Sequence, residues 1–391
     1  MMKIFREFVL PTSILAGTII GAGIFSLPYV FSQSGLGLGY LFLILFGLVY
    51  AVVHTMYADI VIKNGDEHRF VGLAKIYFGR FGYWLSVLMT IVEMIFVLAI
   101  YLVLSVSFLS LVFPGIPVVY QMVIFWWIAS LIIFSGTKKI AFFETLAVIG
   151  ILAVIAIIAW LGLNNFFNKP FVLISSSWNF WLLPFGALLF SINGRPAIPT
   201  VTHYFKKNGF PEEKSKWSII WGTLIPVIAY GFFVAGALGV SSVVTADTVT
   251  GIANSIPSPV LILILAILGI LSLISSYFTI GLDVFRSLEL DLNFSRKFSM
   301  FLVIAVPLII YFMNLGNFIT LVEIAGGIFI GLEGILIVAM WNKMKKGLAQ
   351  AGIVRPGLIH FKSNLVIYGL YTIFGISIAY VIFENFIRNF I

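Results

Sequence analysis

The sequence contains no cysteine and carries little charge. Without cysteine the chain can form neither disulfides nor thiolate metal sites, and it has no thiol nucleophile. Only 10% of its 391 residues are charged, whereas 61% are hydrophobic and the mean hydropathy is +1.13. Soluble domains carry roughly 25% charged residues. The composition therefore excludes a soluble globular domain and indicates an all-α integral membrane protein.

Enzyme signatures are missing as well. The four histidines, which we place at or near the cytoplasmic side, lack the spacing of zinc motifs: His54, His68, His203 and His360. No glycine-rich nucleotide loop with its lysine occurs, so we expect neither an enzyme nor an ATP-driven pump. We expect no cofactor apart from a coupling ion. We attribute the formal net charge of +8 to membrane topology, and no nucleic-acid partner is expected.

Long apolar runs predict the architecture. With about 20 apolar residues per membrane span, the sequence predicts eleven transmembrane helices embedded in the lipid bilayer. They are expected at 8–32, 37–62, 82–112, 118–136, 139–162, 178–205, 215–240, 258–288, 297–313, 317–342 and 364–388. Two further segments, 69–80 and 245–256, are either amphipathic helices outside the membrane or ordinary loops.

The basic residues between these runs predict the orientation. If the N-terminus is cytoplasmic, 20 of the 23 lysines and arginines fall in cytoplasmic segments. Lysine and arginine concentrate on the cytoplasmic side of membrane proteins. We therefore expect a multi-pass protein of the cell membrane with a cytoplasmic N-terminus and an external C-terminus.

Two predicted spans contain residues that interrupt helices. The first span includes "LAGTIIGAGIFSLPY", and glycine costs about 1 kcal/mol and proline about 3 kcal/mol inside a helix. Gly17 and Gly21 alone could mark a small-residue packing seam. The sixth span, "LLFSINGRPAIPTVTHYF", contains Asn193, Gly194 and Pro196 at mid-span, so two helices are predicted to be broken.

The positions of the two breaks predict an inverted repeat. Because five spans precede the sixth, the second set of five enters the membrane upside down. Residues 8–162 then form the first repeat, 178–342 the second, and 364–388 an additional helix. Paired breaks in inverted halves are typical of a transporter's central binding site.

The broken backbone predicts the kind of ligand. Freed amides at the start of a half-helix favour a carboxylate, and freed carbonyls favour an ammonium group or a cation. A zwitterion such as an α-amino acid satisfies both ends. The predicted substrate-binding residues are Thr18, Gly21, Ala22, Gly23, Phe190, Ser191, Asn193, Gly194 and Arg195.

The same stretches resemble a known family. "GTIIGAGIFSLPYVFSQSG" resembles the first-helix motif of the amino acid/polyamine/organocation superfamily, and most of all that of the hydroxy/aromatic amino acid permeases, which include tryptophan/tyrosine permeases. "ISSYFTIGLDVFRSLELDL" at 274–292 and Ile198-Pro199-Thr200 resemble two further motifs of that branch. Arg195 departs from the pattern, because the branch usually has histidine there. Arg195 could hold a substrate carboxylate, act as a fixed countercharge or pair with a membrane glutamate.

The sequence allows either of two coupling ions, Na⁺ or H⁺. The superfamily resemblance implies a Na⁺ site formed by the hydroxyls of Ser275 and Ser276 and by carbonyls near Ala16, Gly17 and Ile20; these serines could instead bond to their own helix. Coupling to H⁺ would use intramembrane carboxylates, and Glu93 and Glu333 are the deepest.

Together these features predict a secondary amino acid permease. As the resemblance implies, it works by alternating access, with spans 1, 2, 6 and 7 moving against spans 3, 4, 8 and 9. Aromatic amino acids are the expected substrates, and serine or threonine is the alternative. An amino acid sensor without flux is a further alternative.

Overall fold

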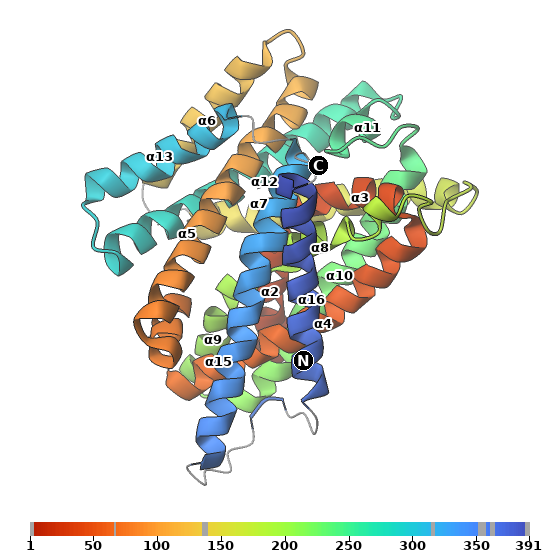
Figure 1. Ribbon diagram of the computed structural model, residues 1–391. Coiled ribbons are helices and arrows are strands. Elements are labelled where there is room, and N and C mark those ends of the chain that lie inside the picture. Colours follow the sequence, from red (N-terminus) through yellow and green to blue (C-terminus); the bar gives the residue numbers. More distant parts are fainter. Residues whose placement is uncertain are drawn as a thin grey trace.

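The computed structural model describes residues 4–65, 68–134, 140–313, 317–350, 357–359 and 364–387. Within these ranges the chain forms helices and no strands. The helices pack into one bundle, and the two chain ends lie towards opposite poles of it (Figure 1). The α-helices are α2 (Leu10–Ile19), α3 (Leu27–Ser34), α4 (Leu36–Asn64), α5 (Phe70–Val112), α6 (Val118–Phe134), α7 (Ile140–Phe166), α8 (Pro184–Ile192), α9 (Ile198–Lys207), α10 (Ser215–Val240), α11 (Val249–Ala253), α12 (Pro259–Arg286), α13 (Arg296–Phe312), α14 (Phe318–Glu323), α15 (Gly331–Gln350) and α16 (Leu365–Ile382).

Shorter helical turns of other types extend or connect these helices. Two 3₁₀ turns follow interrupted helices, η2 (Ala22–Ser26) and η5 (Arg195–Ala197), and two more are η4 (Trp178–Phe180) and η6 (Glu212–Lys214). Wider π turns are η1 (Phe5–Val9), η7 (Ser287–Asp291), η8 (Ile324–Ile330) and η9 (Phe383–Ile387). Segments η8 and α15 continue α14, so the predicted tenth span is one helix with a π segment in its middle.

Among the described residues, seven helices are long and apolar enough to cross a membrane, or eight if the bent pair of half-helices at the N-terminus is one span. Each of the other three predicted spans overlaps a shorter or broken helix: the fourth is α6, the sixth is α8 with α9, and the ninth is α13. The predicted ends at 136, 139 and 388 lie outside the described residues. The count of eleven crossings and the inverted repeat stay predictions.

The two segments predicted between spans are both helical in part. The 69–80 segment is helical, but it continues into the third span as α5, with a turn at Gly79 (φ 62°, ψ −145°). A positive φ angle is a backbone conformation that glycine adopts at little cost, which is why the change of direction falls there. Of the 245–256 segment, only α11 is α-helical.

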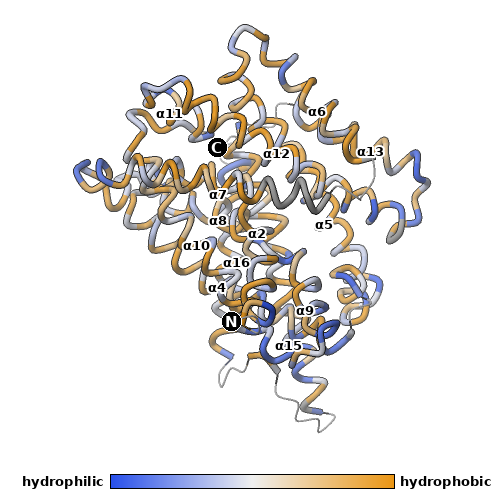
Figure 2. The backbone as a smooth tube through the Cα atoms, turned by 180° about the vertical axis from the view of Figure 1, so that it is seen from behind, coloured by the Kyte–Doolittle hydropathy of each residue, from blue (hydrophilic) through white to orange (hydrophobic). Residues whose placement is uncertain are grey.

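Polar residues gather at the ends of the bundle. Figure 2 shows hydrophilic segments around the pole that carries the N-terminus and in the connecting loops, while the helices between them are mainly hydrophobic. Such a distribution fits a bundle whose middle faces lipid.

Glycines allow two helix pairs to approach closely. A Cβ atom on Gly162 of α7 would lie 1.8 Å from the carbonyl oxygen of Gly236 in α10. A Cβ atom on Gly326 of η8 would lie 1.9 Å from the carbonyl oxygen of Gly186 in α8. Close backbone contact through small residues is a main source of helix association in membranes. The second contact holds the predicted tenth span against the first half of the sixth.

Candidate functional site

The first predicted span is broken, as the sequence indicates. Helix α2 ends at Ile19, and the backbone leaves helical geometry at Ile20 (φ −73°, ψ 97°) and Gly21 (φ −143°, ψ −158°) before η2 begins. The half-helices Phe5–Ile19 and Ala22–Ser34 are bent by 49°. The peptide groups around Gly21 therefore lack the regular hydrogen bonds of a helix.

The sixth predicted span is broken too. Helix α8 ends at Ile192, Asn193 is extended (φ −64°, ψ 117°), and Gly194 (φ −126°, ψ 11°) precedes η5 and α9. Pro196 lies at the start of η5, where its missing amide donor costs no hydrogen bond. Both predicted interruptions are thus confirmed.

The two breaks contact each other. A Cβ atom on Gly23 would lie 2.6 Å from Oγ and 2.7 Å from Cα of Ser191. A Cβ atom on Gly194 would lie 2.7 Å from side-chain atoms of both Leu15 and Ile19. The interrupted segments, about 170 residues apart in the sequence, therefore form a single site with no room for larger side chains between them.

One tyrosine connects both breaks. The Tyr230 hydroxyl of α10 lies 2.7 Å from the carbonyl oxygen of Ile19 and 2.9 Å from that of Ser191, and it accepts a hydrogen bond from the Gly21 amide. Its side chain is fully buried. Because lipid offers no hydrogen bonds to these peptide groups, this hydroxyl stabilises the broken conformation of both helices.

We expect Tyr230→Phe to impair function without removing the fold. Leaving buried polar groups unpaired costs about 1–3 kcal/mol, so the rate of amino acid uptake in proteoliposomes should fall by roughly ten- to a hundredfold if the broken conformation is needed. Tyr40→Phe is the matched control, because the Tyr40 hydroxyl donates to the Gly231 carbonyl at 2.9 Å, away from the breaks. Equal uptake by both variants would contradict a special role for Tyr230.

Two side chains of α4 satisfy peptide groups at the second break. His54 Nε2 accepts a hydrogen bond from the Gly194 amide at 3.1 Å, and Nδ1 lies 2.9 Å from Oγ1 of Thr223. The Tyr50 hydroxyl donates to the Leu189 carbonyl at 2.9 Å. His54, expected at or near the cytoplasmic side, is 1% exposed and lies at the second break.

A buried cluster of charged residues lies beside the second break. Arg195 Nε is 2.7 Å from Oε2 of Glu333 on α15, and both side chains are buried. Glu93 of α5 accepts a hydrogen bond from Asn193 Nδ2 at 3.3 Å, and its carboxyl group contacts that of Glu333. Of the interactions open for Arg195, the pair with a membrane glutamate is present.

An aromatic residue covers this cluster. The Phe70 ring at the start of α5 lies 4.6 Å from Cζ of Arg195, in cation–π geometry, and packs edge-on against Tyr57. Phe70 is 2% exposed. Next to it, Arg69 pairs with Asp283 of α12 at 3.4 Å. The first segment of α5 thus lies over the cluster.

Other predicted site residues are distributed around the first break. Tyr101 of α5 connects that break to α12, because its hydroxyl is hydrogen-bonded to the Ala22 backbone and to the Ser276 side chain. Ser275, the residue before Ser276, is buried. Ser191 donates to the Ala187 carbonyl of its own helix at 2.7 Å, and Phe190 contacts the position that a Gly23 Cβ would take.

Three predicted residues face other surroundings. The Thr18 side chain is exposed, and its hydroxyl donates to the Ile14 carbonyl at 3.0 Å. Gly17 faces Val148 of α7, with 3.4 Å between Val148 Cγ2 and a Gly17 Cβ. The Ala16 carbonyl accepts the Ile20 amide at 3.0 Å. The structure does not bring Thr18 to the breaks.

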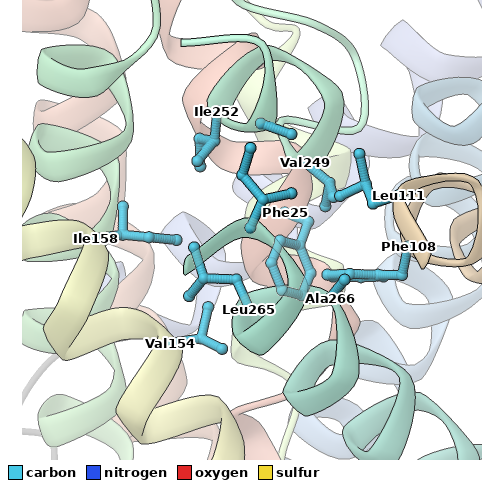
Figure 3. A pocket seen from close by; sticks show the side chains of 11 residues that line it. Phe25, Phe108, Leu111, Val154, Ile158, Val249, Ile252, Leu265 and Ala266 are labelled. Atoms are coloured by element: carbon cyan, nitrogen blue, oxygen red, sulfur yellow. The ribbon is translucent and has the colours of Figure 1, made fainter. Parts of the chain in front are cut away.

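An apolar pocket lies one helical turn beyond the first break. Figure 3 shows Phe25 at its centre, with side chains from α5, α7, α11 and α12 around it. The lining includes Phe108, Val154, Ile252 and Leu265. Phe25 also packs edge-on against Phe108 and Phe233. The lining carries no charged group, and the cavity of about 20 Å³ is smaller than an aromatic ring, so these side chains would have to separate to admit an apolar or aromatic moiety.

The sequence motifs do not mark Tyr50, His54, Tyr101 and Tyr230 as site residues. A signal was available, because a Tyr or His inside a long apolar run has a polar tip that requires a buried partner. The sequence does not reveal which partner that is, since each of these bonds joins residues of different helices.

Comparisons with known proteins agree with this arrangement. A model of the tryptophan/tyrosine permease family matches residues 6–375. The tyrosine-specific transport system 2 of Haemophilus influenzae is 26% identical over 298 residues, covering 70% of this chain and 71% of that protein. The neutral amino acid transporter 9 of Danio rerio is 32% identical over 97 residues, which is 24% of this chain and 18% of that protein.

Solved transporters share the fold. The inward-facing conformation of Mhp1 aligns with a TM-score of 0.66 and 14% identity, covering 96% of this chain and 89% of that one. MhsT in complex with L-phenylalanine aligns with a TM-score of 0.56 and 18% identity, covering 96% and 98%. The likeness in fold to these transporters therefore covers nearly the whole chain.

Proposed function

We propose, since this chain belongs to the tryptophan/tyrosine permease family, that it is a secondary active, ion-coupled symporter of aromatic amino acids. Amino acid transport follows from the family and from the tyrosine transport relative. The aromatic substrate, the ion coupling and the alternating-access mechanism are our proposal. We further propose that it resides in the cell membrane with its N-terminus in the cytoplasm.

The observation that carries the proposal is the contact between the two broken helices. Their interrupted backbones meet through Gly23 and Ser191, so peptide dipoles from two helices point at one place. The amide end of η2 suits a carboxylate, while carbonyls at the end of α8 suit an ammonium group. In our proposal a zwitterionic amino acid binds these peptide groups beside the Gly23–Ser191 contact, next to Tyr101, whose hydroxyl is hydrogen-bonded to the Ala22 backbone.

Aromatic side chains near the first break support the choice of substrate. Phe25 follows the Gly21–Gly23 segment by one turn and is surrounded by Phe108 and Phe233. Aromatic pairs with offset or edge-on geometry are favourable by about 0.5–1.5 kcal/mol beyond the burial of their area. An indole or phenol ring would find partners here, whereas a serine side chain would gain little.

Uptake of a labelled amino acid panel tests the proposal. The full chain in proteoliposomes should exchange external labelled tryptophan, tyrosine or phenylalanine against unlabelled internal substrate. Saturable exchange with at least about tenfold preference over serine and threonine, or about 1.4 kcal/mol, supports the proposal. Preference for serine or threonine would favour a hydroxy amino acid permease, and saturable binding without exchange would favour a sensor. Either result would overturn aromatic transport.

The coupling ion has two candidate sites. A Na⁺ site at Ser275 and Ser276 with carbonyls of Ala16, Gly17 and Ile20 would lie at the first break. Carboxylates at Glu93 and Glu333 would instead carry H⁺ beside the second break. Repeating the uptake with a sodium gradient alone and a proton gradient alone separates the two.

A further inference from the structure

The cluster of Glu93, Glu333 and Arg195, here named the acid cluster, joins three separate elements of the fold. Glu93 comes from α5, Glu333 from α15 and Arg195 from η5. Their exposed fractions are 6%, 2% and 5%. Ionisable residues are costly within a membrane span, so their presence there indicates a functional role.

The charges of the acid cluster do not balance when both glutamates are ionised. Arg195 neutralises Glu333 through the 2.7 Å contact. Glu93 has only the neutral amide of Asn193 as a donor, and its second oxygen, Oε2, has no donor among the described residues. One net negative charge would then be buried, at a cost of several kcal/mol per ion.

Other groups around Glu93 do not supply the missing positive charge. Tyr50 and Tyr57 of α4 are neutral side chains near the cluster; Tyr50 donates to the Leu189 carbonyl, and Tyr57 packs against Phe70. His54 of the same helix accepts the Gly194 amide and is thereby kept neutral. Arg69 already pairs with Asp283 at the exposed edge. Within the part of the chain that the structure describes, Arg195 is the cation that pairs with the acid cluster, and it does so through Glu333.

A proton on Glu93 removes both the buried net charge and the repulsion between the two carboxylates. The carboxyl groups of Glu93 and Glu333 contact each other, and two carboxylates in contact repel. If Glu93 carries a proton, its O–H can donate to the Glu333 carboxylate, and the cluster becomes neutral. The contact between the two carboxyl groups is therefore repulsive when Glu93 is ionised and a hydrogen bond when Glu93 is protonated.

The charge of Glu93 is connected to the second break. Asn193, the first non-helical residue there, donates from Nδ2 to Glu93 Oε1 and accepts the Arg195 amide at Oδ1, 3.2 Å away. A neutral Glu93 is a weaker acceptor than a carboxylate, because charge-assisted hydrogen bonds are roughly twice as strong. Protonation would thus loosen the contact that fixes Asn193.

Access of water to the cluster is restricted on one side by Phe70. Its ring covers the Arg195 guanidinium, and α5 turns at Gly79 just beyond this segment. A movement of the segment 70–78 about Gly79 would expose the cluster to solvent at the pole where the N-terminus lies.

We propose that Glu93 is the proton-binding residue of the transport cycle, with Glu333 and Arg195 setting its charge balance and Asn193 relaying its state to the broken sixth span. This inference rests on the proposed transport function. It assigns coupling to the second break, away from the Ser275 and Ser276 hydroxyls at the first.

The test compares exchange with gradient-driven accumulation in proteoliposomes. For one proton per substrate, a pH gradient of one unit supports about tenfold accumulation of labelled tryptophan, or of the amino acid that exchanges best. In Glu93→Gln we expect this accumulation to disappear, while exchange at equal pH stays within about threefold of the unmodified chain. Glutamine keeps the size of the side chain and acts as a permanently neutral glutamate.

Glu323→Gln is the matched control. Glu323 of α14 is also a buried glutamate with an asparagine neighbour, Asn385 at 3.5 Å, but it lies outside the acid cluster. This variant should retain proton-driven accumulation. Glu93→Asp, which keeps an ionisable group, should retain accumulation as well, and it serves as the second variant if Glu93→Gln does not fold.

Several outcomes would overturn the inference. They are full proton-driven accumulation in Glu93→Gln, loss of accumulation in Glu323→Gln alone, and accumulation by the unmodified chain driven by sodium but not by protons. If Glu93→Gln does not fold, loss of accumulation in a folded Glu93→Asp would overturn it as well. Absence of exchange in the unmodified chain would instead overturn the proposed transport function, so the two failures are distinguishable.

Discussion

Arg195→Gln is expected to abolish amino acid uptake and to lower the stability of the protein strongly. The substitution removes the partner of Glu333, whose side chain is 3% exposed, and leaves two contacting carboxyl groups without a cation. Breaking a buried ion pair by removing one partner costs about 3–5 kcal/mol. The loss of cation–π contact with Phe70 adds to this. Thermal unfolding in detergent and uptake in proteoliposomes measure the two effects.

A double variant separates charge from packing. In Arg195→Gln/Glu333→Gln no unpaired charge is created by the loss of the arginine, so most of the stability should return, while uptake should remain impaired. Arg69→Gln is the control, because Arg69 and Asp283 form an ion pair with side chains 58% and 39% exposed. Exposed pairs contribute about 0–1 kcal/mol. A stability loss in Arg195→Gln no larger than in Arg69→Gln would contradict the importance of the buried pair.

Gly23→Ala is expected to reduce the rate of uptake by at least about tenfold, which corresponds to about 1.4 kcal/mol in the activation free energy of the rate-limiting step. The added methyl group would lie 2.6 Å from Oγ and 2.7 Å from Cα of Ser191. Since one of these atoms belongs to the backbone, the two half-helices must separate. Inserting a methylene into a packed core typically costs about 1–3 kcal/mol, and here the cost falls on the geometry of the proposed binding site.

Gly369→Ala provides the control for this substitution. Gly369 lies in α16, and an added Cβ has no neighbour within 4 Å. Alanine is favoured over glycine by about 1 kcal/mol inside a helix, so this variant should be as stable as the unmodified chain or more stable, with unchanged uptake. Equal uptake by Gly23→Ala and Gly369→Ala would show that the contact between the breaks is not required for transport.

Residues that interrupt a helix were predicted well from the sequence. Gly21, Asn193 and Gly194 interrupt long apolar runs, and the backbone leaves helical geometry at or beside each of them. Local propensity favours these breaks, because glycine and proline are unfavourable inside a helix; Pro226 and Pro307, which lie inside α10 and α13, show that it does not act alone. The merging of the 69–80 segment with the third span at Gly79 was not predicted, because a single positive φ angle has no distinct sequence signal.

Partners across helices were predicted only in general terms. The pattern of membrane carboxylates singled out Glu93 and Glu333, and pairing with Arg195 was one of the expected roles. The bonds of Tyr230 to the first break and of His54 to the second join positions 211 and 140 residues apart. No local pattern specifies such bonds, and His54 was expected near the edge of the membrane.

The sequence by itself determined the class of protein and the places where its helices break, because hydropathy and helix propensity act along the chain over a few turns. The tertiary structure alone decided what the breaks meet: Ser191 against Gly23, Tyr230 against both backbones, and Glu93 beside the Arg195–Glu333 pair. Those contacts depend on the relative position and rotation of several helices. In lipid, helix packing and buried hydrogen bonds set that arrangement.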